Sequence, residues 1–133
     1  MLFEMKTYSR SKQLRISLTS DKRNGNTIAF VPTMGNLHDG HIQLVRRAKQ
    51  IADKVVVSIF VNPLQFGVNE DLSSYPRTLA ADKEKLFSEG VDYLLYPDVE
   101  EIYPHGMNKQ TLVMVPDLSD TLCGEARPGH FSG

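Results

Sequence analysis

Residues 31 to 41 read Val31-Pro32-Thr33-Met34-Gly35-Asn36-Leu37-His38-Asp39-Gly40-His41, and the surrounding sequence is organised about this turn. An apolar run precedes the turn and an amphipathic pattern follows it, which predicts a strand that passes into a helix. Gly35 and Gly40 let the backbone approach a ligand closely and adopt φ angles that a Cβ would forbid. Because a helix that begins near Asp39 or Gly40 directs its unpaired N–H groups at the turn, the turn is predicted to hold a nucleotide phosphate.

Two histidines, His38 and His41, flank the predicted phosphate position. Imidazole titrates at about pH 6.5, so each ring can donate a hydrogen bond or a proton to a phosphoryl oxygen as charge builds on it. Taken alone, the pattern His-x-Gly-His is short enough to occur by chance, and two exposed loop histidines would explain it equally well. A metal site of His38, Asp39 and His41 is disfavoured because the ligands would crowd into a single turn, and no metal ligand is predicted.

Composition restricts the class of protein. The chain has 133 residues, of which 41% are hydrophobic and 23% charged, as expected of one globular domain. The formal net charge of -1 gives no electrostatic case for nucleic acid or a membrane surface, so small-molecule partners are expected. The single cysteine, Cys123, excludes an intrachain disulfide and fits a reducing compartment. No apolar run approaches the about 20 residues of a membrane span and no signal peptide is evident, so a cytoplasmic location is expected.

Apolar runs alternate with helical patterns along the chain. Strands are expected at 27–31, where Pro32 ends the run, at 54–61, and at 91–96. Helices are expected at 9–20, from about residue 39 to 52, and at 79–89. This order predicts a parallel three-stranded sheet of the α/β class, with its first strands buried on both faces. A short strand over 110–115 and a helical turn over 118–122 are expected to follow.

Ligands of open α/β sheets bind beyond the carboxyl ends of the strands. Asn62 and Gln65 follow the second strand, so they are expected to face the same crevice as the histidines. Asn62 has an alternative role in shaping the turn before Pro63, and the two roles can coexist. The loop over 67–76 is either a lid or a plain connection. The glycine-rich tail over 124–133 could hold an anion through its arginine or be a surface loop.

The strand-to-helix turn resembles the signature of the nucleotidyltransferase superfamily, and a longer set of blocks resembles one family closely, the pantoate-beta-alanine ligases. The blocks lie in order at 31–41, 57–67, 71–72 with 75–78, 101–104 and 127–133. Several blocks in order are far more specific than His-x-Gly-His alone. The resemblance implies a Rossmann-like parallel sheet and a two-step reaction, in which ATP and Mg²⁺ convert pantoate to pantoyl adenylate and beta-alanine then displaces AMP.

The resemblance also implies roles for individual residues. The ATP-binding segment would comprise Met34, Gly35, Asn36, Leu37, His38, Asp39, Gly40 and His41. His38 and His41 would be the catalytic residues, with His41 at the position of the proton donor. Gln65, Asn62 and Met34 would contact the substrates pantoate and beta-alanine.

The family continues beyond the point that corresponds to Gly133. The resemblance therefore implies that residues 1–133 are an N-terminal nucleotide-binding domain, incomplete at its C-terminus and without the C-terminal domain. Apolar faces left exposed in this way would favour a homodimer. Two alternatives stay open: a fragment that binds ATP or pantoate without turnover, and another nucleotidyltransferase that transfers AMP to a phosphorylated acceptor. Gln65 argues against the second alternative, because such an enzyme would carry an acidic side chain at this position.

Overall fold

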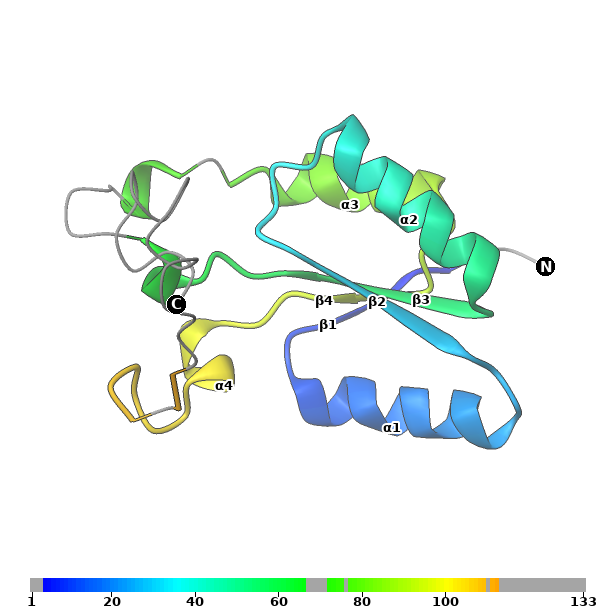
Figure 1. The fold of residues 1–133 in the computed structure, drawn as a ribbon, viewed down its shortest axis with the longest axis horizontal. Coiled ribbons are helices and arrows are strands. Elements are labelled where there is room, and N and C mark those ends of the chain that lie inside the picture. The colour runs from blue at the N-terminus through cyan, green and yellow to red at the C-terminus, as the bar shows by residue number, and fades with distance from the viewer. Residues whose placement is uncertain (1–3, 67–71, 76, 110, 113–133) are drawn as a thin grey trace.

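The computed structural model describes residues 4–66, 72–75, 77–109 and 111–112. In this part of the chain a parallel sheet lies between helices on both faces (Figure 1). The strands are β1 (Lys6–Tyr8), β2 (Ile28–Thr33), β3 (Lys54–Ile59) and β4 (Tyr93–Leu95), in the order β1-β4-β3-β2. The helices are α1 (Ser11–Arg23), α2 (Asp39–Ile51), α3 (Leu79–Ser88) and α4 (Val99–Ile102), with single 3₁₀ turns at Pro63–Gln65 and Leu72–Ser74. The predicted α/β class and the parallel pairing are confirmed.

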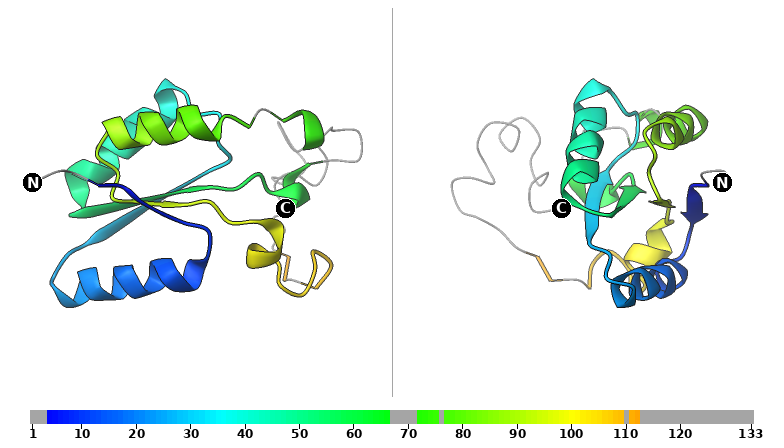
Figure 2. Two further views of the ribbon diagram at one scale, coloured as in Figure 1. Left: turned by 180° about the vertical axis from the view of Figure 1, so that it is seen from behind. Right: turned by 90° about the vertical axis from the view of Figure 1, so that its right-hand side faces the viewer.

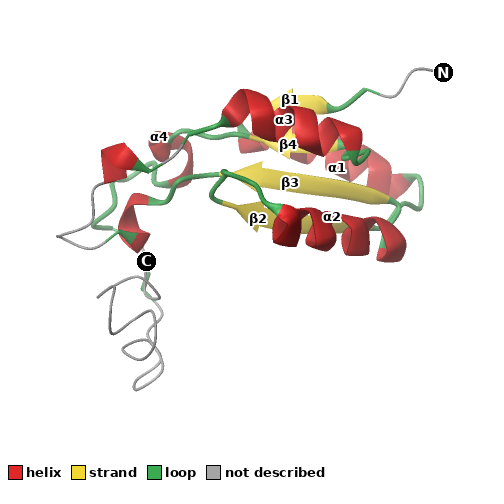
Figure 3. Cartoon of the chain, turned by 90° about the horizontal axis from the view of Figure 1, so that it is seen from above, coloured by secondary structure: helices red, strands yellow, loops and turns green. Residues whose placement is uncertain are grey.

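The sheet has a different helix layer on each face, as the end-on view in Figure 2 shows. Helix α1 covers one face, where Leu14 packs with Val56 and with apolar side chains of β4. Helices α2 and α3 cover the other face, where Val45 and Leu86 pack against Val57. Because β3 is covered on both faces, its side chains are buried along nearly its whole length, which explains its unbroken apolar run. Figure 3 shows the same arrangement from above, with α2 and α3 side by side over the sheet.

The sheet differs from the sequence-based expectation at both of its edges. A strand that was not expected, β1, pairs with β4 at one edge, so the sheet has a fourth strand beside the three that were expected to form it. At the other edge of the described sheet lies β2, which was expected to be a central strand buried on both faces, yet Phe30 is 59% exposed. The prediction that Pro32 ends this strand was also wrong, because β2 continues to Thr33.

Edge position explains why β2 tolerates a proline. The carbonyl of Thr33 accepts the N–H of Phe60 beyond β3, so the neighbouring Pro32 turns its nitrogen away from β3. No described strand pairs with β2 on the side away from β3, so the missing N–H of Pro32 costs no hydrogen bond of the described sheet.

Some expected elements lie outside the described residues. These are most of the strand over 110–115, the helical turn over 118–122, the tail over 124–133 and much of the loop over 67–76. None of the described helices has the length and apolarity needed to traverse a bilayer.

Candidate active site

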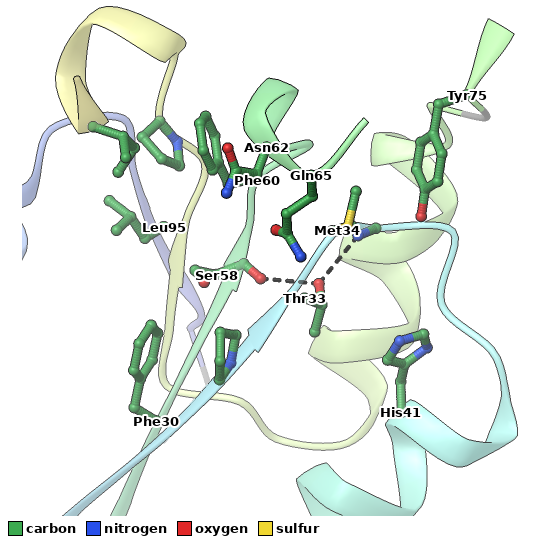
Figure 4. A pocket seen from close by; sticks show the side chains of 14 residues that line it. Phe30, Thr33, Met34, His41, Ser58, Phe60, Asn62, Gln65, Tyr75 and Leu95 are labelled. Atoms are coloured by element: carbon green, nitrogen blue, oxygen red, sulfur yellow. Dashed lines mark hydrogen bonds between the residues drawn. The ribbon is translucent and has the colours of Figure 1, made fainter. Parts of the chain in front are cut away.

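The carboxyl ends of β2, β3 and β4 open into a cavity of about 580 Å³ (Figure 4). This volume lies in the range of sites that bind small molecules. The apolar residues that line the cavity are Phe30, Pro32, Met34, Phe60, Leu95, Pro97 and Ile102. The other lining residues in the described part of the chain are Thr33, Gly35, His41, Ser58, Asn62, Gln65 and Tyr75. The cavity therefore offers both apolar and polar side chains to one ligand.

The loop between β2 and α2 is fixed by backbone conformation and by contacts with β3. Gly35 has φ +83°, and a Cβ built on it would lie 3.1 Å from Cγ2 of Ile59. Its N–H donates to Oγ1 of Thr33 at 3.2 Å, and that hydroxyl donates to the carbonyl of Ser58 at 2.9 Å, as the dashed lines in Figure 4 show. Asn36 follows with φ +52°, a left-handed conformation that costs a non-glycine residue about 1 kcal/mol or more. The loop thus has a single, closely defined path.

The two histidines of this loop cap helix α2 together. Nδ1 of His38 accepts the N–H of Gly40 at 3.0 Å, and Nδ1 of His41 accepts the N–H of His38 at 3.1 Å. The rings lie with their centroids 4.0 Å apart. This is the reciprocal arrangement of a capping box, with imidazoles in place of the usual hydroxyl and carboxylate. Because each Nδ1 is an acceptor, the proton of each neutral ring is on Nε2, which can donate outward.

The electrostatics favour the neutral form of His41. Burial lowers the pKa of His41, the neighbouring His38 lowers it further, and Asp82 partly opposes both effects. The ring is therefore a neutral hydrogen-bond donor at pH 7. Its side chain points into the cavity beside Met34 and Thr33 in Figure 4.

A buried carboxylate on α3 holds the same loop from behind. Oδ2 and Oδ1 of Asp82 accept the N–H groups of Asn36 at 2.9 Å and Leu37 at 3.0 Å. The hydroxyl of Thr78 donates to Oδ2 at 3.1 Å, and Nζ of Lys85 donates to the carbonyl of Leu37 at 2.8 Å. Sequence reasoning missed Asp82, because an acidic residue in the first turn of a helix usually serves that helix alone.

Comparisons with known proteins decide the family. The model of the pantoate-beta-alanine ligase family matches residues 6–133. The chain belongs to the pantoate-beta-alanine ligase family. It is 58% identical over 129 residues to the pantothenate synthetase of Cellvibrio japonicus, covering 97% of this chain and 46% of that relative. It is 62% identical over 120 residues to the pantothenate synthetase of Stutzerimonas stutzeri, covering 90% of this chain and 42% of that relative. The chain thus spans a little under half the length of these curated relatives.

Solved structures of the ligase family share the fold. The pantothenate synthetase of Thermus thermophilus has a TM-score of 0.84 and 46% identity, over 96% of this chain and 44% of that one. The pantoate-beta-alanine ligase of Francisella tularensis, complexed with beta-gamma ATP and beta-alanine, has a TM-score of 0.86 and 41% identity, over 98% of this chain and 49% of that one. These similarities confirm the Rossmann-like assignment.

The structure brings several of the predicted site residues together. His41, Met34 and Gly35 lie on the cavity wall with Gln65 and Asn62, as predicted for residues that meet at the carboxyl edge of the sheet. The side-chain Oδ1 of Asn62 accepts the N–H of Leu64 at 3.1 Å and the hydroxyl of Tyr103 at 2.8 Å. Asn62 therefore shapes the turn and lines the cavity at the same time.

Other predicted ATP-binding residues of the ligase lie off the described cavity wall. Leu37 is 4% exposed and packs in the core, so its side chain faces away from any ligand. The remaining members are exposed along the loop and the first turn of α2, and they are Asn36, His38, Asp39 and Gly40. The ring of His38 lies against the ring of His41, which does line the cavity.

The ligase block over 101–104 has a structural role that the sequence did not disclose. The carboxylate of Glu101 accepts both the N–H and the hydroxyl of Ser11, each at 2.8 Å, and so caps helix α1. Ile102 lines the cavity, and Tyr103 holds Asn62. The block joins α1, α4 and the 3₁₀ turn at Pro63–Gln65 around the site.

Proposed function

We propose that this protein acts as a pantoate-beta-alanine ligase, condensing pantoate with beta-alanine at the expense of ATP. The single observation that carries the proposal is the imidazole capping box of α2 at the mouth of the cavity. A phosphate bound there would meet a positive helix end and the Nε2–H donors of the imidazoles, which supports the proposal. Membership of the family and the ligands of the Francisella tularensis relative support the choice of substrates.

The first step forms pantoyl adenylate. A carboxylate oxygen of pantoate forms a bond to the α-phosphorus of ATP, and the bond from that phosphorus to the bridging oxygen breaks. The electron pair leaves with pyrophosphate, and no net proton transfer is required. Negative charge builds on the phosphoryl oxygens, where Nε2–H of His41 and of His38 would stabilise it.

The second step forms the amide. The amine of beta-alanine attacks the acyl carbon of pantoyl adenylate, the bond from that carbon to the phosphate oxygen breaks, and AMP leaves as the amine gives up its proton. Holding the reactants in line supplies much of the acceleration in both steps.

The mixed lining of the cavity suits pantoate, which carries both methyl and hydroxyl groups. Gln65 and Asn62 would hydrogen-bond its polar groups, and Met34 would contact its methyl groups. The apolar side chains of Phe60 and its neighbours would exclude water from the reactive adenylate.

Magnesium would arrive with ATP as part of the substrate. The described residues contain no group of three or more His, Cys, Asp or Glu side chains placed to hold a metal ion. Mg²⁺ commonly binds phosphate oxygens and keeps several waters, so it needs no protein cage here.

We also propose a homodimer and a cytosolic location. Support for the homodimer comes from large apolar side chains on the surface, among them Leu44 and Ile51 of α2, which are 57% and 63% exposed. Sedimentation equilibrium of the full-length gene product would test it, and a monomer at micromolar concentration would contradict it. A biosynthetic ligase that consumes ATP fits the cytosol.

The function is tested by exchange of labelled pyrophosphate into ATP by the full-length gene product. We expect exchange that needs pantoate but not beta-alanine, and amide formation that needs both. His41→Ala should abolish exchange, whereas His105→Ala should not, because His105 is exposed and lies off the described cavity wall. Exchange that ignores pantoate would overturn the choice of substrate.

A further inference from the structure

Asp82 is the most deeply buried charged group of the described structure, and the mechanism above does not use it. Asp82 is 1% exposed, and it does not line the cavity of about 580 Å³. A buried carboxylate needs donors to offset the loss of water. The donors that Asp82 has identify its role.

The donors come chiefly from the loop and not from the helix that carries Asp82. The N–H groups of Asn36 and Leu37 reach its two oxygens at 2.9 and 3.0 Å. The N–H of Asp82 itself is bonded to the carbonyl of Thr78 within α3. A role in capping its own helix therefore does not account for its carboxylate.

Leu37 is held at both of its backbone polar groups by side chains of α3. Its N–H donates to Asp82, and its carbonyl accepts from Nζ of Lys85 at 2.8 Å. The next residue is His38, whose N–H is the donor that orients the ring of His41. The carboxylate, the Leu37 peptide and the imidazole pair form one continuous chain of contacts.

The same carboxylate maintains the unusual conformation of the loop. Asn36 keeps φ +52°, a left-handed conformation that the bond from its N–H to Asp82 helps to hold. Gly35 is packed so closely that a Cβ on it would lie 3.3 Å from Oδ2 of Asp82. The left-handed bend at residues 35 and 36 is thus shaped around this oxygen.

We propose that Asp82 is a positioning residue of the active site, which holds Asn36 and Leu37 so that both imidazoles keep Nδ1 on the backbone and the ring of His41 keeps its Nε2–H available to the cavity. Thr78 and Lys85 complete this clamp. Its effect on turnover depends on the proposed ligase function, whereas its effect on the imidazoles does not.

The test compares Asp82→Asn with Asp92→Asn in the full-length gene product. Asp82→Asn keeps the volume but places an NH₂ group against one of the two loop N–H groups. Asp92 is a matched control, because its Oδ2 accepts the N–H of Val55 at 2.8 Å at the start of β3, at the opposite end of the strand from the cavity.

Two readings are taken. The first is the ¹⁵N chemical shifts of the histidine rings, which distinguish Nδ1 from Nε2 protonation. In Asp82→Asn we expect the rings of His38 and His41 to lose the uniform Nε2–H pattern, and in Asp92→Asn to keep it. The second is steady-state kinetics, where Asp82→Asn should lower kcat about 10²-fold with little change in KM for pantoate.

Wild-type ring shifts and an unchanged kcat in Asp82→Asn would overturn the proposal. If that variant does not fold, Lys85→Met and Thr78→Val decide, since each removes one contact of the clamp without burying a new charge. Either must shift the same ring resonances, and wild-type shifts in both would overturn the proposal. Absence of pantoate-dependent exchange in the wild type would refute the function alone, because the ring shifts are read without turnover.

Discussion

Helices α1 and α2 both begin at the carboxyl edge of the sheet, but their N-termini are closed by opposite kinds of group. At α1 the N-cap residue, Arg10, provides no side-chain cap, and the carboxylate of Glu101 arrives from α4 to accept the N–H of Ser11. At α2 two imidazoles accept the N–H groups. A helix N-terminus attracts anions. The first terminus already holds an anion of the protein, whereas the second carries imidazole N–H donors that, under the proposed function, would meet an anion of the substrate.

The comparison shows how one fold assigns different roles to equivalent helix ends. A carboxylate cap neutralises the positive end of α1 and joins it to α4. The imidazole cap at α2 satisfies backbone N–H groups of that terminus without adding a carboxylate, which is compatible with the phosphate site that we propose there. The identity of the capping atom decides which terminus is structural and which is chemical.

The largest expected effect is in His41→Gln. Glutamine at this position of a capping box can still accept the N–H of His38, but its amide NH₂ does not occupy the place of the rigid imidazole Nε2–H donor. We expect pantoate-dependent pyrophosphate exchange to fall about 10²-fold to 10³-fold, as for loss of one oxyanion donor, with little change in Tm. Exchange assays and thermal unfolding of the full-length gene product measure the two effects.

A matched variant separates chemistry from capping. His41→Ala removes both the acceptor and the donor, so its Tm should fall below that of His41→Gln while exchange is lost in both. A glutamine variant with wild-type exchange would show that α2 is closed for structural reasons only, as α1 is.

The second prediction compares glycines that adjoin the two helices. Gly35, before α2, has φ +83°, and Gly25, after α1, has φ +84°. Alanine at Gly25 would meet nothing within 4 Å. Gly25→Ala should therefore lower the free energy of unfolding only by the cost of the left-handed backbone conformation, about 1 to 2 kcal/mol. Alanine at Gly35 would also press on Ile59 and Asp82, so Gly35→Ala should cost roughly 1 kcal/mol more. Urea unfolding measures both costs, and equal costs would mean that the loop before α2 yields easily.

Local patterns in the sequence were enough to predict α2 and β3, and to predict that β3 pairs in parallel with β2. The apolar stripe of α2 and the β-branched run of β3 are each contained in one short segment, so periodicity and composition disclose them. Strand β1 could not be predicted, because Lys6-Thr7-Tyr8 has no apolar run and pairs with residues 93–95, far along the chain.

The sequence predicted only those site residues that lie in the strand-to-helix turn or directly after a strand. Gly35 and the histidines were located from the strand-to-helix turn, and Asn62 and Gln65 from the rule for carboxyl ends of strands. The contacts of Asp82 and Glu101 were missed. Each carboxylate accepts a backbone N–H of an element far away in the sequence, and no local pattern discloses such a contact. The use of imidazoles as caps was missed too, since capping is read from hydroxyl and carboxylate residues.

The third prediction concerns the anionic cap of α1. Glu101→Gln should lower Tm and leave pyrophosphate exchange unchanged, because Glu101 holds Ser11 and does not line the cavity. The hydrogen bond from the Ser11 backbone, the largest effect, lowers the pKa of Glu101 below its ordinary 4.5. The stabilisation is therefore complete above that value and is lost as the pH falls through the lowered pKa. The Tm difference between wild type and Glu101→Gln should shrink in that range.

The smallest expected effect is the pH dependence of the neutral cap of α2. Because the pKa of His41 is lowered from 6.5 by burial and by His38, the unfolded state binds a proton first as the pH falls. Stability should therefore decrease from about pH 6.5 downward, a higher pH window than the one in which the Glu101 cap is lost. Urea unfolding of wild type and His41→Gln between about pH 7.5 and 5.5 measures it. The wild type should lose more stability over this range, and parallel losses would mean that His41 is equally easy to protonate in the folded chain. Two termini that respond in separate pH windows would establish that their caps differ in charge and not merely in position.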